Sequence, residues 1–354
     1  MAVDGLSALA LLCAALLPGA CGLLASRAAQ SAVGQSPCNG ADGSWVWEQN
    51  KDIAEYYNLS GASDEMVGSA QSRFQPQGTQ LFMNAFMWEW KPASAECKFV
   101  KMNRDSFCAG MEKHGLTRFL MVGDSISYMM AESFWGLVGG RGDVGRQLSL
   151  LSLGQGRSRL QQRIDCPAGQ VLFSYIRNDR LTNSSEAEDC QDICRPWWST
   201  YVADERPTLL LVNTGIHTHS MERFAADFDT FTSRLASVAH RRPKDLLYFR
   251  LTLPGHDDCE LHHSPFQSAA QFSLDGPRAR RFSWNLVPSF NQYVKWKVSL
   301  LAAFQKINLN VLDPYRLTIL RPDGHRGDVG DCLHYYLPGA VDWWSHLLAT
   351  LLLA

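Results

Sequence analysis

The sequence predicts an α/β fold in which a central parallel sheet is covered by helices on both faces. From residue 116 onward, short apolar segments alternate with longer segments of helical periodicity. Such alternation implies right-handed crossovers, which join parallel strands and place helices on both faces of the sheet. The predicted strands are short and apolar, as buried parallel strands are, and they cover residues 117–122, 170–176, 208–213, 245–252 and 309–312. The predicted helices cover residues 125–138, 220–240, 284–304 and 339–353.

The helix predicted over residues 220–240 has the clearest amphipathic pattern. Its apolar residues follow one another at intervals of three or four, which places them on one face; they are Phe224, Phe228, Phe231 and Leu235.

At the ends of the predicted strands, polar residues are the informative feature. Ser125 follows one strand and Asn213 ends another. Because the carboxyl ends of parallel strands meet at one edge of a sheet, we expect both side chains at that edge.

The part of the chain before residue 116 is organised differently. Its start, from Leu6 to Leu24, is rich in Leu and Ala and carries no charge, which predicts a secretory signal peptide or an uncleaved signal anchor. A buried N-terminal helix is the alternative. A linker rich in Ser, Ala, Gly and Gln follows, and then an irregular aromatic-rich subdomain precedes the α/β domain. These changes divide the chain into residues 1–25, 26–44, 45–115 and 116–354.

The cysteines agree with entry into the secretory pathway. Two of the ten lie in the predicted leader, and an even, dispersed set of eight remains. Such a set in a secreted chain predicts disulfides, although their pairing cannot be deduced from the sequence. Cys190 and Cys194 have a spacing that zinc sites use, but no second pair of ligands follows, so we expect no metal. Asn58 and Asn183 each begin a glycosylation triplet, which fits a lumenal chain.

Composition restricts the class of partner. The chain has 354 residues, of which 46% are hydrophobic and 19% charged, so it is long and apolar enough for a globular core. The formal net charge is −2, and no basic region favours nucleic acid. We therefore expect a neutral partner or one that is recognised locally.

Ser125 is the candidate nucleophile. It stands where a strand passes into a helix, so its own backbone N–H lies at a helix N-terminus, where it can stabilise an oxyanion. The alternative is that Asp124 or Ser125 simply caps the helix. Far downstream, Asp331 and His334 supply the other two groups of a serine hydrolase, an orienting carboxylate and a base. Three residues apart, they would share one side of a helical turn.

Other residues near these segments have weaker support. His325 is the rival base, but no Asp stands at a matching distance from it. Asn213 can donate a second hydrogen bond to the oxyanion, or it can simply form a turn with the glycine that follows. Gly154 is a positional candidate for a third donor. His217 and His219 lack further metal ligands at suitable spacing, which favours polar loop residues.

Aromatic residues supply candidate sugar-binding surfaces. Trp88 and Trp90 lie two residues apart in an aromatic stretch, and Trp197 and Trp198 are adjacent. Aromatic rings can stack on sugars, but each of these residues more often belongs to a core or a domain interface.

These motifs together resemble the plant trichome-birefringence-like family of polysaccharide O-acetyltransferases, in the PC-esterase branch of the SGNH/GDSL superfamily. The similarity extends from about residue 38 to the C-terminus, and its end resembles the family's DGH and DCxHWCLPGxxDxWNxLL motifs. The segments that carry it are Cys38, residues 43–46, residues 88–92 with Cys97, residues 119–125, residues 213–215 and residues 321–348.

The resemblance implies a three-layer α/β/α SGNH-hydrolase-like fold with a disulfide-linked N-terminal extension. It also implies a Ser-His-Asp triad of Ser125, His334 and Asp331, an oxyanion hole that includes Asn213, and an acetyl-enzyme that is attacked by a sugar hydroxyl. The chain departs from the family pattern in three places. Tyr128 replaces an Arg that plant members have three residues after the serine, and Tyr336 replaces the second cysteine of DCxHWC. The family's NTGHWW-like stretch reads NTGIHT at residues 213–218. We include Tyr128 among the candidate substrate-binding residues.

The first functional hypothesis is a carbohydrate O-acetyltransferase with an acyl-serine intermediate. The second is a carbohydrate O-acetylesterase, in which water is the acceptor, and the third is a non-catalytic glycan-binding protein. We expect no bound cofactor, an acyl donor such as acetyl-CoA as co-substrate, and a glycan as acceptor. The leader predicts the Golgi lumen, with membrane anchoring as a type II protein, or secretion.

Overall fold

The computed structural model describes residues 36–51, 85–139, 159–182, 194–305 and 307–354. Their centre is a six-stranded sheet with the order β4-β5-β3-β6-β7-β8, in which β5, β3, β6, β7 and β8 are parallel and β4 is an antiparallel edge strand. All five predicted strands are present. The strands are β3 (Arg118–Gly123), β4 (Arg159–Cys166), β5 (Gly169–Arg177), β6 (Thr208–Val212), β7 (Leu246–Arg250) and β8 (Leu309–Leu312).

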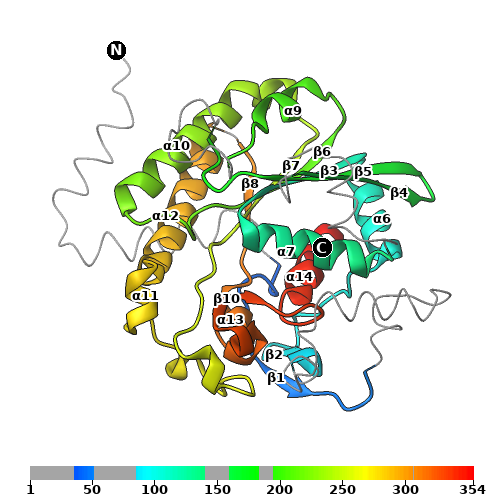
Figure 1. The fold of residues 1–354 in the computed structure, drawn as a ribbon. Helices are drawn as coiled ribbons and strands as arrows, with labels where there is room; N and C mark the ends of the chain where they lie inside the picture. Colours follow the sequence, from blue (N-terminus) through cyan, green and yellow to red (C-terminus); the bar gives the residue numbers. More distant parts are fainter. Residues whose placement is uncertain (1–35, 52–84, 140–158, 183–193, 306) are drawn as a thin grey trace.

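Helices cover both faces of this sheet, as predicted (Figure 1). Residues of β3 alternate between two apolar clusters: Phe119 packs with residues of the α7 face, whereas Leu120 packs with those of the opposite face. One layer contains α6 (Arg104–Lys113), α7 (Ser125–Leu137) and α14 (Asp342–Leu353). The other contains α9 (Trp198–Ala203), α10 (Met221–Val238) and α12 (Val287–Leu300). The three-layer α/β/α architecture is therefore confirmed.

The predicted helices are present with small changes at their ends. The segment predicted over 284–304 is a 3₁₀ turn, then α12, then a π-helical turn, and α14 begins three residues later than predicted, at Asp342. The remaining short helices are α11 (Pro277–Arg281) and α13 (Tyr315–Thr318). The single turns are η4 (Ala239–Arg241), η5 (Cys259–Leu261), η6 (Ala269–Gln271), η7 (Trp284–Leu286), η8 (Leu301–Gln305), η9 (Pro322–Gly324) and η10 (Gly327–Val329).

The described residues before 116 pack onto the same core. β1 (Gly43–Trp47) and β2 (Trp88–Pro92) pair antiparallel, with Trp45 opposite Trp90. Both of these tryptophans belong to the apolar cluster that also contains residues of α6, α7 and α14. Helix α6 begins with a capping box, in which Asn103 and Ser106 bond each other's backbone N–H groups. This extension therefore forms part of the core on the α7 side of the sheet.

Disulfides are present, as predicted. They join Cys38 to Cys97, Cys108 to Cys166 and Cys259 to Cys332, and Cys194 is also disulfide-bonded. The first joins the segment before β1 to the segment after β2, within the N-terminal extension, and the second attaches α6 to β4.

Several predicted features lie outside the described residues. They are the leader at 1–25, the two glycosylation triplets, Gly154 and Cys190. Within the described ranges, no helix is long and apolar enough to cross a membrane.

Opening the Cys259–Cys332 disulfide should destabilise the fold. The bridge closes a loop of 73 residues. Its loss therefore raises the conformational entropy of the unfolded chain, which stabilises the unfolded state. We expect Cys259→Ser to lower the free energy of unfolding by about 2–4 kcal/mol, measured by denaturant titration with the unpaired Cys332 alkylated. Equal stability of the variant and the natural chain would contradict a structural role for this bridge.

Candidate active site

Ser125 is the first residue of α7, directly after the turn that ends β3. Asp124 is fully buried and caps the helix, because its Oδ1 accepts hydrogen bonds from the N–H groups of Ile126 at 2.9 Å and Ser127 at 3.0 Å. The turn requires glycine at position 123, since a Cβ there would lie 2.3 Å from the Ser127 Oγ. Asp124 therefore performs the capping, and the Ser125 hydroxyl is left for another partner.

That partner is His334. Its Nε2 lies 2.8 Å from the Ser125 Oγ, and its Nδ1 lies 2.9 Å from the Oδ2 of Asp331. The structure thus brings together the three side chains that the sequence analysis selected. The imidazole and the carboxylate are each 29% exposed, so the arrangement is open to solvent on one side.

The charge on Asp331 determines which nitrogen of His334 carries the proton. Burial alone would raise the pKa of the Asp331 carboxyl, but hydrogen bonds from the His334 ring and from the N–H groups of His334 and Leu333 outweigh burial and hold the pKa well below its usual range. The carboxylate is therefore ionised at neutral pH and accepts a hydrogen bond from Nδ1–H. Nε2 of the neutral ring then presents its lone pair to the Ser125 hydroxyl.

The local structure around Asp331 differs from the predicted helical turn. Residues Asp331–Tyr335 form strand β10, which pairs antiparallel with the two-residue strand β9 (His325–Arg326) through an irregular register. Asp331 Oδ1 accepts the N–H groups of Leu333 at 3.2 Å and His334 at 3.1 Å. This side-chain turn, rather than a helix, brings the carboxylate and the imidazole to the same side.

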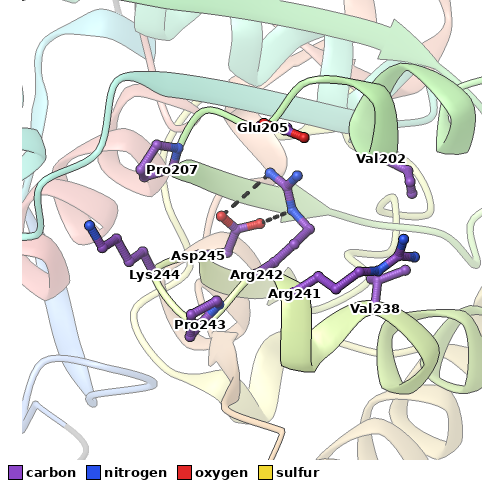
Figure 2. Close-up of a pocket in the computed structure, with 9 residues that line it drawn as sticks. All are labelled: Val202, Glu205, Pro207, Val238, Arg241, Arg242, Pro243, Lys244 and Asp245. Carbon is purple, nitrogen blue, oxygen red and sulfur yellow. Dashed lines mark hydrogen bonds and ion pairs between the residues drawn. The ribbon is translucent and has the colours of Figure 1, made fainter.

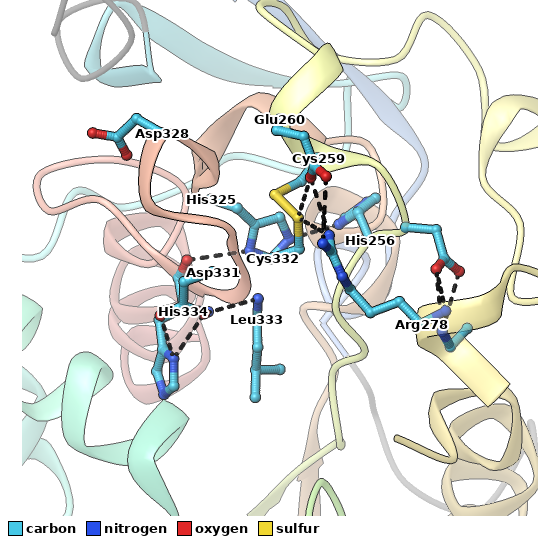
Figure 3. The surroundings of a disulfide bond; sticks show 12 residues. His256, Cys259, Glu260, Arg278, His325, Asp328, Asp331, Cys332, Leu333 and His334 are labelled. Atoms are coloured by element: carbon cyan, nitrogen blue, oxygen red, sulfur yellow. Dashed lines mark hydrogen bonds and ion pairs between the residues drawn. A yellow bond between two sulfur atoms is a disulfide. The ribbon is translucent and has the colours of Figure 1, made fainter. Parts of the chain in front are cut away.

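The rival base, His325, is held elsewhere. It is 2% exposed, and its Nε2 lies 2.7 Å from the Nδ1 of His256, which is equally buried. Its other nitrogen faces the backbone carbonyl of His334 at 3.3 Å. Both nitrogens of His325 are thus directed at protein groups other than the Ser125 hydroxyl (Figure 3).

The buried histidine pair should make stability depend on pH. Burial lowers the pKa of His256 from 6.5 to about 4 and lowers that of His325 well below its usual value. The unfolded chain therefore binds protons that the folded chain excludes, and the free energy of unfolding should fall as pH drops from about 6.5 to about 4, by up to ~1.4 kcal/mol per pH unit for each group. Denaturant titration of His325→Gln across this range should give a shallower slope, and identical slopes would contradict the assignment.

Asn213 lies at the predicted edge, but its amide is engaged. Its backbone N–H bonds the carbonyl of Val122 at 3.0 Å, which places it beside the end of β3. Its side chain is 2% exposed, and both polar atoms bond Arg250: Nδ2 donates to the Arg250 carbonyl and Oδ1 accepts from Nη2, each at 2.8 Å. The oxyanion role of Asn213 stays a prediction, and Gly154 lies outside the described residues.

Arg250 is a feature of the site that the sequence analysis missed. It ends β7, is 1% exposed, donates to the Ser127 Oγ at 3.1 Å and lies 3.9 Å from the carboxylate of Asp124. Burial lowers its pKa to about 10, so it remains charged at neutral pH. A single arginine at the end of an otherwise apolar strand was the available signal. It links Asp124, which follows β3, and Asn213, which follows β6, to the end of β7.

A second charged group stands on the other side of β3. Arg177, which is opposite Gly123 in the strand register, makes two hydrogen bonds to Asp179, of 2.9 and 3.1 Å. His217, interpreted from sequence as a polar loop residue, lies 3.4 Å from the same buried carboxylate. These residues extend the polar edge of the sheet beyond the serine.

The aromatic candidates lie in different environments. Trp90 is 2% exposed and packs edge-on against Trp45 at 5.6 Å, which favours the core interpretation over a stacking surface. Trp88 is half-buried beside Trp47. Tyr128 is on α7, one turn after the serine, with its ring 5.5 Å from that of Tyr175. Substrate binding by Trp88 and Tyr128 stays a prediction.

A pocket of about 440 Å³ lies at the opposite edge of the sheet (Figure 2). Its lining includes Pro207 and Asp245, which directly precede β6 and β7. Asp245 accepts hydrogen bonds from Tyr201 and from Arg242. The pocket is therefore at the amino ends of the strands, whereas Ser125 and His334 meet at the carboxyl ends, where ligands bind in such sheets.

Comparison with known proteins identifies two plant relatives. Xyloglucan O-acetyltransferase 1 of Arabidopsis thaliana is 36% identical over 66 residues, which cover 14% of this chain and 16% of the relative. Protein trichome birefringence-like 20 of the same plant is 37% identical over 57 residues, which cover 13% of this chain and 12% of the relative. The chain thus aligns with less than a fifth of the length of either relative, and no family model matches it.

Proposed function

We propose that this chain, a relative of the trichome-birefringence-like proteins, is a carbohydrate O-acetyltransferase that works through an acyl-serine. The observation that carries the proposal is the hydrogen bond of 2.8 Å between the Ser125 hydroxyl and His334, whose ring is oriented by Asp331. The name of one relative, xyloglucan O-acetyltransferase, supports polysaccharide O-acetyl transfer in general.

The first half-reaction moves an acetyl group onto the serine. His334 Nε2 takes the hydroxyl proton as Ser125 Oγ attacks the acetyl carbonyl carbon, and the negative charge that develops on the carbonyl oxygen faces the N-terminus of α7. The imidazolium, which Asp331 stabilises, then returns the proton to the leaving group. In this scheme acetyl-CoA is the donor, so the leaving group departs as a thiol.

The second half-reaction regenerates the enzyme. A sugar hydroxyl enters beside His334, which removes its proton while the oxygen attacks the acetyl-serine. The acetyl ester of the sugar leaves, and Ser125 recovers its proton from the imidazolium. The disulfides of the described residues fit the oxidising lumen of the secretory pathway, so the proposed place of action is the Golgi lumen or the cell exterior.

Hydrolysis is the second candidate, because the triad is open to solvent. His334 and Asp331 are each 29% exposed, so water can reach the acyl-serine as readily as a hydroxyl group unless a bound acceptor displaces it. The chemistry up to the acyl-serine is identical in the two cases.

An acceptor panel separates the two candidates and tests the substrate class. After acetylation of the enzyme, we expect acetyl to move to neutral glycans such as xylan, mannan or glucan oligosaccharides, with little dependence on salt. The reason is the net charge of −2. The arginines of α11, Arg278, Arg280 and Arg281, form a basic run near Cys332, but Arg278 is paired with Glu260. Arginines 157, 159 and 163 are more widely spaced in sequence; among them Arg163 lies exposed on the edge strand β4.

Mass spectrometry of the glycans at two salt concentrations makes the measurement, with Ser125→Ala as the control. Release of free acetate at the same rate with and without glycan would establish the esterase. Preference for pectic oligosaccharides that is lost at the higher salt would contradict a neutral acceptor, since screening weakens charge-driven encounters. A chain that binds glycans and never forms an acyl-serine would instead be a non-catalytic binding protein.

A further inference from the structure

We propose that His256 and His325 form a buried positioning pair that holds β10, and through it the Asp331–His334 couple, in register with Ser125. This inference rests on the proposed function, because it assigns the pair a part in activating that serine. In Figure 3 the two rings lie behind the backbone of β10, and the side chain of His334 points away from them.

The hydrogen bonds determine the tautomers of both neutral rings. His256 Nε2 lies 2.8 Å from the carbonyl oxygen of Ile319, which can only accept, so Nε2 carries the hydrogen. Nδ1 of His256 is therefore an acceptor, and His325 Nε2, 2.7 Å away, is its donor. A chain of donors and acceptors thus runs from the Ile319 carbonyl through His256 to His325.

The pair contacts β10 on both sides of His334. The backbone N–H of His256 donates to the carbonyl of Cys332 at 3.1 Å. His325 places its Nδ1 3.3 Å from the carbonyl oxygen of His334, and its ring lies 4.0 Å from the ring of Tyr335. The pair therefore contacts the residue two positions before His334 and the residue directly after it. Nδ1 of His325 carries no hydrogen in this tautomer, so its approach to the His334 carbonyl is a packing contact and not a hydrogen bond.

β10 needs such support because its own pairing is weak. Its partner β9 has two residues, the register between them is irregular, and Gly330, just before β10, has a φ of +71°. β10 is also attached to η5 by the disulfide between Cys332 and Cys259. Since a displacement of about 1 Å at a reacting group can lower a rate by about a hundredfold, a fixed β10 is a condition for serine activation.

The burial of both rings favours a positioning role for the pair over a role in acid–base catalysis. His256 and His325 are each 2% exposed, and the removal of their rings from water lowers the pKa of both. The pair is thus neutral at neutral pH and beyond the reach of a substrate. Its effect on the reaction passes through the backbone of β10.

The test measures how fast a fluorophosphonate probe labels Ser125, which requires no knowledge of donor or acceptor. His325→Leu has similar bulk but no donor, whereas His325→Gln places an amide N–H near the position of Nε2 and keeps the bond to His256. We expect the labelling rate to fall by about 10- to 100-fold in the leucine variant and to stay within about threefold of the natural chain in the glutamine variant. With p-nitrophenyl acetate, kcat should fall and KM should change little.

A double-variant cycle tests whether the two rings act as a unit. His256→Leu should slow labelling as much as His325→Leu, and the double variant should be no slower than either. Rates are normalised to the folded fraction from near-ultraviolet circular dichroism. Wild-type labelling in the leucine variant, equal loss in the glutamine and leucine variants, or multiplicative losses would overturn the inference. So would unfolding of both leucine variants, since the pair would then serve stability alone.

Failure of the proposed function has a different signature. If the natural chain is not labelled, or if Ser125→Ala is labelled equally, the serine is not an activated nucleophile and the proposed chemistry falls, whatever the histidine variants do.

Discussion

Replacement of Ser125 by alanine is expected to lower the rate of acetyl-ester cleavage by about three to six orders of magnitude. The proposed reaction passes through a covalent bond to the Ser125 Oγ, and the variant has no atom that can form it. The fold should persist, because Asp124 rather than Ser125 caps α7. The hydroxyl makes the bond of 2.8 Å to His334, so its loss should change the free energy of unfolding by only about 1 kcal/mol.

The measurement combines turnover of p-nitrophenyl acetate with mass spectrometry of the acetylated peptide. Ser237→Ala is the matched control, since Ser237 is exposed near the end of α10 and its hydroxyl bonds only the backbone of the same helix. Acetyl should be found on the peptide that contains Ser125 in the natural chain and in the control. Equal acetylation of the Ser125→Ala variant would show that the label is carried by another residue.

The strands that carry this site could be predicted because burial leaves a strong pattern. A parallel strand covered on both faces is a short continuous apolar run, and each of the five runs found in the sequence is a strand of the sheet. The common edge of Ser125 and Asn213 followed from the same rule, because β3 and β6 are neighbours and parallel. Long amphipathic helices such as α10 gave an equally clear signal.

Elements with mixed exposure could not be predicted in the same way. β4 is an edge strand whose sequence, RLQQRIDC, is largely polar, so no apolar run marks it. β10 is a strand because it pairs with β9 and because Asp331 bonds two backbone N–H groups, and neither interaction has a periodic pattern. Helix α6 is short, and its capping box begins inside a segment with no clear period.

The network around the site is the part least accessible to sequence. Arg250 bonds Asn213 and Ser127, which are distant in the chain and meet only because three strand ends converge. The pairing of His256 with His325 depends on a separation of 69 residues. Contacts between residues this far apart are set by tertiary packing, which a single sequence does not display.

Replacement of His334 by alanine should lower turnover nearly as much as loss of the serine, by about three to six orders of magnitude. The variant has no lone pair beside Ser125 Oγ, so the hydroxyl proton has no acceptor in the attack. His325 should not compensate, because it is buried and directed at His256 and at the backbone of residue 334. His240→Ala is the control, since this exposed histidine lies in η4 at the opposite edge of the sheet.

Asp331→Asn keeps the shape of the side chain but removes the charge that fixes the tautomer of His334. An asparagine amide can donate toward His334 Nδ1, which favours the tautomer whose hydrogen is on Nε2 and faces the serine; the expected loss is about four orders of magnitude. In the proposed mechanism the three residues act as a unit, so the Ser125→Ala/His334→Ala double variant should be no slower than either single variant. Losses that multiply would contradict this: the 2.8 Å contact between Ser125 and His334 would then be a structural hydrogen bond, and the base would be another group.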